Sequence, residues 1–295
     1  MGIAAGLASA ALWAATNLIL RGQLQRLGGA MANAWRTTFA SLCFAVVFLL
    51  VRDPRDLFRI PPHTLAVLTA SVLLSLVLGD IMQFTAINRI GVALAMPISA
   101  CSPLFTLAIA AAYLDEALSL RAVCGAAVVV VGVTLVAVPR RALVTAEHSR
   151  HREVTANHWI GVALALAAAV CGSFSTTLMR VAITDLDTVV ANMLRLPFSA
   201  VLCFIIGYFQ RGLLPWQVGG RRNFGALFLA GLVSMVGGFL FLTTVKTLGA
   251  GKTATLNAAA PIFGLCGAVL FLGERPAPRN IAGAIIAFAG IALVV

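Results

Sequence analysis

The chain has 295 residues, of which 61 % are hydrophobic and 11 % are Asp, Glu, Lys or Arg, whereas soluble globular chains average roughly 45–50 % apolar and about 25 % charged residues. So few charges cannot cover a soluble domain of this size, and disorder is excluded because it combines low hydrophobicity with high net charge. The net charge of +11 does not indicate a nucleic-acid partner, since all basic residues except Arg36 and Arg195 lie in gaps between apolar segments, where they meet lipid headgroups.

Ten apolar segments follow one another along the chain, and each is close to the roughly 20 residues that span a bilayer as a helix. In order they are Gly2–Leu20, Met31–Val51, Leu65–Ile87, Val92–Leu114, Ala122–Val138, Trp159–Met179, Val189–Phe209, Phe224–Val245, Thr253–Leu272 and Ile281–Val295. The sequence therefore predicts an all-α polytopic membrane protein with ten transmembrane helices. Such a protein is expected in the bacterial inner membrane, with no soluble catalytic module.

Cysteine and histidine placement argues against disulfides, metal and catalysis. All six cysteines lie in apolar segments without a CxxC pair, which favours packing thiols. His148 and His151 lie three residues apart in a polar stretch with no nearby cysteine, which favours a solvated linker over a metal site. All four histidines lie at segment ends or in gaps, and Asp80 is the only acid well inside a span. We therefore expect no enzyme activity, no metal and no cofactor.

An internal repeat relates the two halves of the chain. Sliding residues 103–136 onto residues 261–294 gives 12 identities in 34 positions without a gap, including matched Pro, Glu and Arg residues. Residues 32–36 likewise fall on residues 191–195. We predict a first five-helix repeat over residues 1–138, a polar linker over 139–156 and a second five-helix repeat over 157–295. Because five is odd, the second repeat enters the membrane from the opposite side, which is the inverted topology of many secondary transporters.

Several of these residues resemble a known family. The first-helix segment Ala11-Leu12-Trp13-Ala14-Ala15-Thr16-Asn17 is similar to that of EamA-type members of the drug/metabolite transporter superfamily. So is the pattern of Pro103, Leu114-Asp115-Glu116, Gly125 and Gly132, and its copy at Pro261, Leu272-Gly273-Glu274, Gly283 and Gly290. The resemblance implies ten helices, an inverted repeat and export of amino acids, aromatic ones included, or related metabolites. One departure is Cys171-Gly172-Ser173 in the sixth helix, where the first has Leu12-Trp13-Ala14.

The expected function is that of a secondary transporter that exports amino acids and other small amphipathic metabolites by alternating access, with broad specificity. Its partners are then small-molecule substrates and membrane lipids, with no obligate protein partner evident. A sugar-nucleotide or lipid-type carrier of the same superfamily, or a channel-like pore, stays open as an alternative.

Polar side chains inside the spans are the candidates for the substrate pathway, because they are costly there unless they serve a function. They are Trp13, Thr16, Asn17, Asp80, Gln83, Ser99, Ser102, Ser173, Thr176, Thr255 and Asn257. Pro97, Pro103 and Pro261 are predicted to kink helices four and nine and free carbonyls beside these groups. Arg36 and Arg195 are repeat equivalents, each either a structural anchor or a contact for a substrate carboxylate. The small-residue faces from Gly125 to Gly132 and from Gly283 to Gly290 predict close helix packing.

Overall fold

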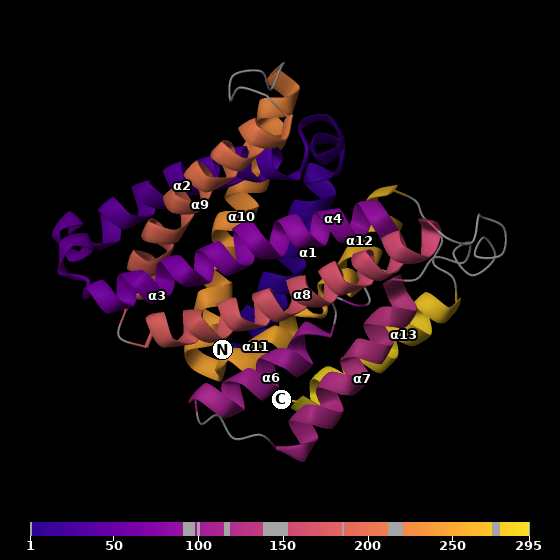
Figure 1. The fold of residues 1–295 in the computed structure, drawn as a ribbon. Helices are drawn as coiled ribbons and strands as arrows, with labels where there is room; N and C mark the ends of the chain where they lie inside the picture. The colour runs from indigo at the N-terminus through magenta and orange to yellow at the C-terminus, as the bar shows by residue number, and fades with distance from the viewer. Residues whose placement is uncertain are drawn as a thin grey trace.

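The computed structural model describes residues 2–90, 98, 101–114, 119–137, 153–184, 186–211, 221–272 and 278–294. Over these ranges the chain forms helices joined by short turns, without any strand (Figure 1). This is the all-α architecture that the apolar composition predicts, since a helix satisfies its own backbone hydrogen bonds in lipid.

The described part of the first half begins with two long helices, and the remaining elements are shorter. They are α1 (Gly2–Leu27), α2 (Gly29–Val51), the 3₁₀-helix η1 (Pro54–Arg59), α3 (Pro62–Val72), the π-helix η2 (Leu73–Gly79), α4 (Asp80–Ile90), α6 (Ser102–Leu114) and α7 (Leu120–Ala137). Gly28 separates α1 from α2 with a φ of 78°, a conformation that favours glycine. The chain can therefore reverse direction within one residue.

The described part of the second half begins with three long helices and ends with three shorter ones. Its elements are α8 (Glu153–Ala182), α9 (Thr188–Arg211), α10 (Arg221–Leu248), α11 (Ala250–Asn257), α12 (Ala260–Leu272) and α13 (Pro278–Val294). Within the part of the chain that the structure describes, five helical segments are long and apolar enough to cross a membrane, namely Gly2–Leu20, Gly29–Val51, His158–Ala182, Thr188–Gln210 and Asn223–Leu248. Four shorter apolar helices accompany them, at Pro62–Ser75, Ser102–Leu114, Leu120–Leu135 and Pro278–Val294.

Two of the predicted spans are interrupted rather than continuous. The third is divided into α3, the π-helix η2 and α4, and the ninth is divided into α11 and α12 by a turn at Ala258 and Ala259. Pro103 and Pro261 each occupy the second position of a new helix, α6 and α12. A proline at the start of a helix removes no intrahelical hydrogen bond. The kinks predicted at these two prolines are therefore helix starts, and Pro97 lies outside the described residues.

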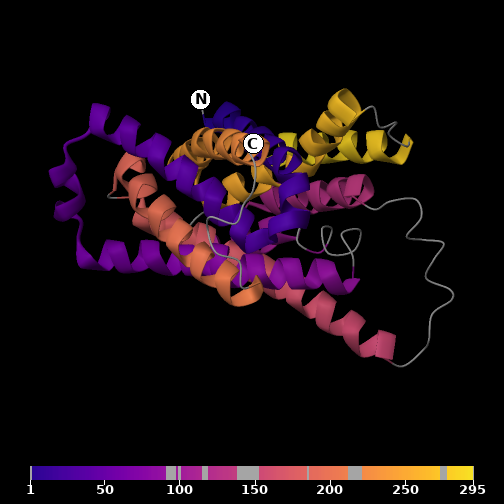
Figure 2. The same ribbon diagram turned by 90° about the horizontal axis from the view of Figure 1, so that it is seen from above.

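The helices of the two halves pack on one another. α1 runs along α10, α2 crosses α9, α7 lies against α13, and α8 packs on α3, η2, α4 and α6 (Figures 1 and 2). The cores formed between them are apolar. One includes Phe48 of α2, Leu68 of α3, Leu242 of α10 and Ile183 in the turn after α8. These contacts tie the first half to the second along most of the described length.

The α7–α13 contact is close enough to exclude side chains at its glycines. A Cβ added to Gly290 would lie 2.6 Å from the Val129 backbone nitrogen and 2.7 Å from the Gly125 carbonyl oxygen. At Gly132 the added atom would overlap the Ala287 backbone. The close helix packing predicted for these small-residue faces is confirmed.

Candidate functional site

The most connected polar group of the described interior surrounds Arg36, and we call Trp13, Thr16, Asn33, Arg36 and Ser234 the Arg36 cluster. Arg36 is 6 % exposed and lies among α1, α2 and α10. Its Nε donates to Asn33 Oδ1 at 2.9 Å, its Nη2 donates to the same oxygen, and its Nη1 donates to Ser234 Oγ at 2.8 Å. Its Cζ lies 5.4 Å from the centre of the Trp13 ring, within the range of a cation–π contact.

Helical spacing positions these groups. Asn33 and Arg36 are three residues apart on α2 and so share a face. Ser234 of α10 also lies 3.2 Å from the Thr16 hydroxyl of α1, and Asn33 Nδ2 donates to Cys203 Sγ of α9 at 3.4 Å. The sequence places Trp13 and Thr16 on one face of a helix and marks Arg36 separately, as a charge inside an apolar segment. The structure brings them together and adds Asn33 and Ser234. Among its contacts, Arg36 donates to the side chains of Asn33 and Ser234.

Arg195, which the repeat aligns with Arg36, has a different environment. Among the described residues its Nε is buried and makes no hydrogen bond, and neither does Ser199 Oγ, four residues further along α9. Asn192, which the repeat aligns with Asn33, donates its Nδ2 to the Thr188 carbonyl of its own helix at 3.0 Å. The position that matches Trp13 is Gly172, and a Cβ added there would meet no atom within 4 Å. Arg36 is paired with neighbouring side chains, whereas the buried Nε of Arg195 has no hydrogen-bond partner among the described residues.

Two serine pairs join α8 to the first half. Ser102 and Ser173 bring their hydroxyls to 3.3 Å, and Ser173 Oγ lies 3.0 Å from the Ser102 carbonyl oxygen. Ser71 and Ser175 bond to each other's backbone carbonyls at 3.0 and 2.8 Å. The predicted pathway residues Ser102 and Ser173 are therefore in contact, while the Ser71–Ser175 pair was not anticipated.

The remaining described candidates bond within their own helices. Asn17 is exposed and donates to the Trp13 carbonyl, while Thr176 and Thr255 donate to the carbonyls four residues before them. Asn257 Nδ2 donates to the Thr253 carbonyl at 3.2 Å. Such back-bonding satisfies a hydroxyl or amide without a ligand. Thr255 is buried, whereas Thr176 and Asn257 are half-buried. Of these four residues, only Asn17 lies beside the Arg36 cluster, through its hydrogen bond to the Trp13 carbonyl.

The other candidates lie on α4, at the start of α12 or outside the described residues. Ser99 lies outside the described residues. Asp80 begins α4, directly after the π-helix, but its side chain is outside the description, as is that of Pro261. Gln83 is half-buried on α4. Among the described residues no group of three or more His, Cys, Asp or Glu side chains gathers that could hold a metal ion.

An aromatic cluster beside Arg36 was not predicted from the sequence. Trp35 of α2 packs against Phe39, Phe204 and Phe224 with ring centres 5.6, 5.5 and 5.1 Å apart, and Phe39 packs edge-on against Phe228 of α10 at 5.6 Å. Edge-to-face aromatic pairs at this spacing are favourable. The cluster holds α2, α9 and α10 together at the end where α2 begins. The sequence signal for this cluster is a pair of aromatic residues four positions apart on one helix, as in Trp35 and Phe39 or Phe224 and Phe228.

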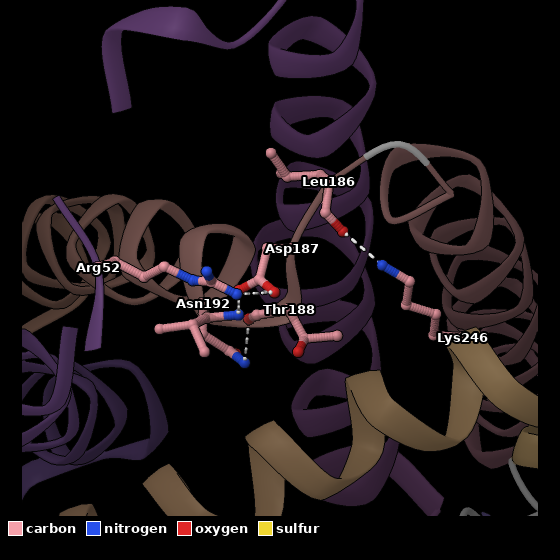
Figure 3. Close-up of polar contacts among 7 residues, drawn as sticks. Arg52, Leu186, Asp187, Thr188, Asn192 and Lys246 are labelled. Atoms are coloured by element: carbon pink, nitrogen blue, oxygen red, sulfur yellow. Dashed lines mark hydrogen bonds and ion pairs between the residues drawn. The ribbon is translucent and has the colours of Figure 1, made fainter. Parts of the chain in front are cut away.

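The opposite end of this helix group is joined by charged groups (Figure 3). Arg52, which follows α2, forms a 2.7 Å ion pair with Asp187, which precedes α9. Lys246 of α10 donates to the Leu186 carbonyl at 3.1 Å, and Arg180 of α8 donates to the Val245 carbonyl at 3.1 Å. Partial burial alone raises the pKa of Asp187, but hydrogen bonds from the Val189 backbone N–H and from Arg52 outweigh it and hold that pKa below its usual range.

These features define a multi-pass helical membrane protein with polar groups buried between its spans. The sequence model of the EamA-like transporter family matches residues 1–138 and 159–295. The chain belongs to this family and is a membrane transporter, which confirms the family resemblance of the sequence motifs.

Two relatives give the same picture over nearly the whole length. An uncharacterized transporter of Archaeoglobus fulgidus is 28 % identical over 293 residues, covering 97 % of this chain and 95 % of its own. A solved crystal structure superposes with a TM-score of 0.75 over 99 % of this chain and 97 % of the other, at 17 % identity. The second likeness shows a shared fold.

Proposed function

We propose that the protein is a secondary transporter that exports amino acids and related small amphipathic metabolites from the cell, across a bacterial inner membrane, by alternating access with broad specificity. In this proposal residues 1–138 and 157–295 are two inverted repeats of five helices. The pathway runs between α1, α2, α8, α9 and α10, past the interrupted third and ninth spans.

One observation carries the proposal, namely the unequal packing of two helix pairs that the repeat makes equivalent. α2 contacts α10 extensively, from the Trp35 aromatic cluster to the core around Phe48 and Leu242. The corresponding helix α9 makes few contacts with α3 and η2. A transporter that alternates between two states closes one of two equivalent helix pairs and opens the other. This asymmetry supports a carrier over a pore that is open at both ends.

The polar groups beside the pathway support a loosely selective site. Trp13 is 48 % exposed halfway along α1, and Asn17 is exposed one turn further on the same face. An amide in the middle of a spanning helix favours a hydrated surface over lipid. One large ring and a few amide and hydroxyl groups can orient an amphipathic solute but cannot read its side chain sharply. Broad substrate choice follows from such a lining.

Flux in proteoliposomes tests the proposal. Purified protein is reconstituted and loaded in turn with ten radiolabelled amino acids. We expect saturable efflux of several of them, and counterflow of labelled substrate against an unlabelled gradient, which only a carrier supports. Flux of a single amino acid would contradict broad specificity, flux without saturation or counterflow would favour a channel, and no flux of any amino acid would reject the substrate class.

A further inference from the structure

The strongest unexplained feature is a pair of buried donors on α9. Four buried side-chain nitrogen or oxygen atoms lack a hydrogen-bond partner among the described residues, and two of these atoms, Arg195 Nε and Ser199 Oγ, lie on one face of α9. The other two belong to Gln23 and Arg279, near helix ends. Ser199 is only 1 % exposed. Buried polar groups in folded proteins are almost always paired, so this pair calls for a ligand or water.

Ser199 is unusual among the hydroxyls of this protein. Most described threonines in helices, such as Thr106, Thr134 and Thr244, donate to the carbonyl four residues earlier, and buried serines such as Ser71 and Ser175 bond to another helix. Ser199 does not bond to the Arg195 carbonyl in this way. Its hydroxyl therefore remains available beside the guanidinium. The repeat gives Ala40 at the matching position of α2, so the Arg36 cluster has no such second donor.

Pro197 lies between the two donors, inside α9, and the sequence analysis overlooked it. A proline within a helix has no N–H for the carbonyl four residues earlier, which here belongs to Met193. One turn of α9 thus carries two donors without partners and one carbonyl that has lost its helical donor. A carbonyl freed in this way is tolerated in a membrane helix where it lines a cavity or is bonded again.

The register of α9 against α2 places this turn at the middle of the helix group. A Cβ on Gly207 would lie 3.2 Å from the Met31 backbone nitrogen, and Asn33 reaches Cys203. In these contacting pairs the residue number rises along α2 as it falls along α9, so the two helices are antiparallel. Ser199 therefore lies near the level of Arg36. Arg195 as a residue is half-buried, and α9 packs only lightly on α3 and η2.

We propose that Arg195 and Ser199 bind the carboxylate of the transported solute, with the Met193 carbonyl facing its ammonium group, and that Arg36 is a structural residue. A guanidinium and a hydroxyl are donors that suit an oxyanion. This inference rests on the proposed transport function for its cargo. The same oxyanion chemistry is present in a lipid phosphate, so the test separates the two sources.

The test compares ligands with and without a carboxylate in phosphatidylcholine nanodiscs. The apparent affinity of ten L-amino acids and their carboxamides is read from the shift in melting temperature with concentration, because a ligand that binds the folded state raises it. Wild-type protein is expected to bind several acids about 10- to 100-fold more tightly than their amides, as a charge-assisted hydrogen bond provides. Arg195→Gln is expected to remove the preference for the acid and to leave the amide affinity unchanged. Arg195→Lys should retain part of this preference, and Ser199→Ala should lower the preference by about 3- to 10-fold.

Thr134→Val is the matched control, because it removes a hydroxyl on α7 that is already back-bonded, and it should leave both affinities unchanged. Equal binding of acid and amide by the wild type, or an unchanged preference in Arg195→Gln, overturns the inference and indicates that only water meets these donors. Stabilisation by phosphatidylglycerol that needs Arg195, without any by amino acids, assigns the site to lipid and also overturns it. Carboxylate-specific binding without flux in proteoliposomes would reject the proposed function and retain this site.

Discussion

The surroundings of Arg36 and Arg195 differ, although the repeat aligns the two residues. Arg36 is enclosed by Asn33, Ser234 and the Trp13 ring, while the Nε of Arg195 is buried among described residues without a hydrogen bond. The aligned positions differ as well, since Gly172 stands in place of Trp13 and Asn192 donates to a carbonyl of its own helix. In the proposal, the substitutions around the two arginines separate a structural role from a ligand-binding role.

Removing each arginine should give the largest contrast. Arg36→Gln leaves Asn33 Oδ1 and Ser234 Oγ without their donor, and each buried group left unpaired costs about 1–3 kcal/mol. Arg195→Gln breaks no hydrogen bond of its Nε and relieves a desolvated charge, so stability should be unchanged or raised. Thermal unfolding of both variants in detergent checks this. A larger loss for Arg195→Gln would reverse the assignment of roles.

Gly172→Trp should make the second half resemble the first. A Cβ at Gly172 would meet no atom within 4 Å. From the repeat we predict that a ring at this position faces Arg195 as Trp13 faces Arg36, and competes with substrate through a cation–π contact of about 0.5–2 kcal/mol. Substrate affinity should fall by about 3- to 30-fold without loss of folding. Gly225→Trp is the control, since Gly225 is exposed and also open. Equal effects of the two variants on transport would show that the ring acts through bulk alone.

The two serines should also respond in opposite ways. Ser234→Ala removes the acceptor of Arg36 and the partner of Thr16, at a cost of about 1 kcal/mol. Ser199→Ala removes a hydroxyl with no partner among the described residues, so the folded state loses nothing and the unfolding midpoint should hold or rise. Chemical denaturation of the two variants side by side measures the difference. Destabilisation by Ser199→Ala would mean that its hydroxyl is bonded in the folded protein.

The smallest effect is expected at the Arg52–Asp187 pair, which is partly exposed and so contributes about 0.2–1 kcal/mol. Because the folded-state pKa of Asp187 is lowered, its contribution is present above the unfolded pKa of about 3.9 and is lost as pH falls through the folded value. Asp187→Asn should therefore lower the melting temperature at pH 7 and have no effect at the acid end. A constant difference between wild type and variant down to pH 2 would contradict this linkage.

Much of the fold follows from sequence because hydropathy reports burial in lipid directly. The predicted span Met31–Val51 differs by two residues from α2, and Val189–Phe209 differs from α9 by one residue at its start and two at its end. The π-helix η2 was not predicted, because it changes the hydrogen-bond register without changing the apolar composition. The break after α11 was predicted only as a kink at Pro261, which instead lies at the start of α12. A proline in the sequence does not by itself tell whether a helix starts there or continues through it, since Pro103 lies at the start of α6 and Pro197 lies inside α9.

Only part of the candidate site could be predicted in the same way. Arg36 and Arg195 stand out as charges inside apolar segments, and Trp13 and Thr16 stand out by helical spacing. Ser234 and Ser199 look alike in sequence, as single serines in apolar helices, yet one is bonded twice and the other has no partner among the described residues. Their difference depends on which side chain of another helix faces each serine. The residues next to each serine in the sequence do not determine this.

Two spin-label distances test the central claim, that equivalent helix pairs open and close in turn. Labels at Leu50 and Thr247 span α2 and α10, and labels at Phe209 and Arg89 span α9 and α4, with every position exposed. Double electron–electron resonance in nanodiscs should find the first pair close and the second apart without substrate. On addition of a transported amino acid, a second population with the two distances exchanged is expected. Single distance distributions that do not respond to substrate would contradict the account.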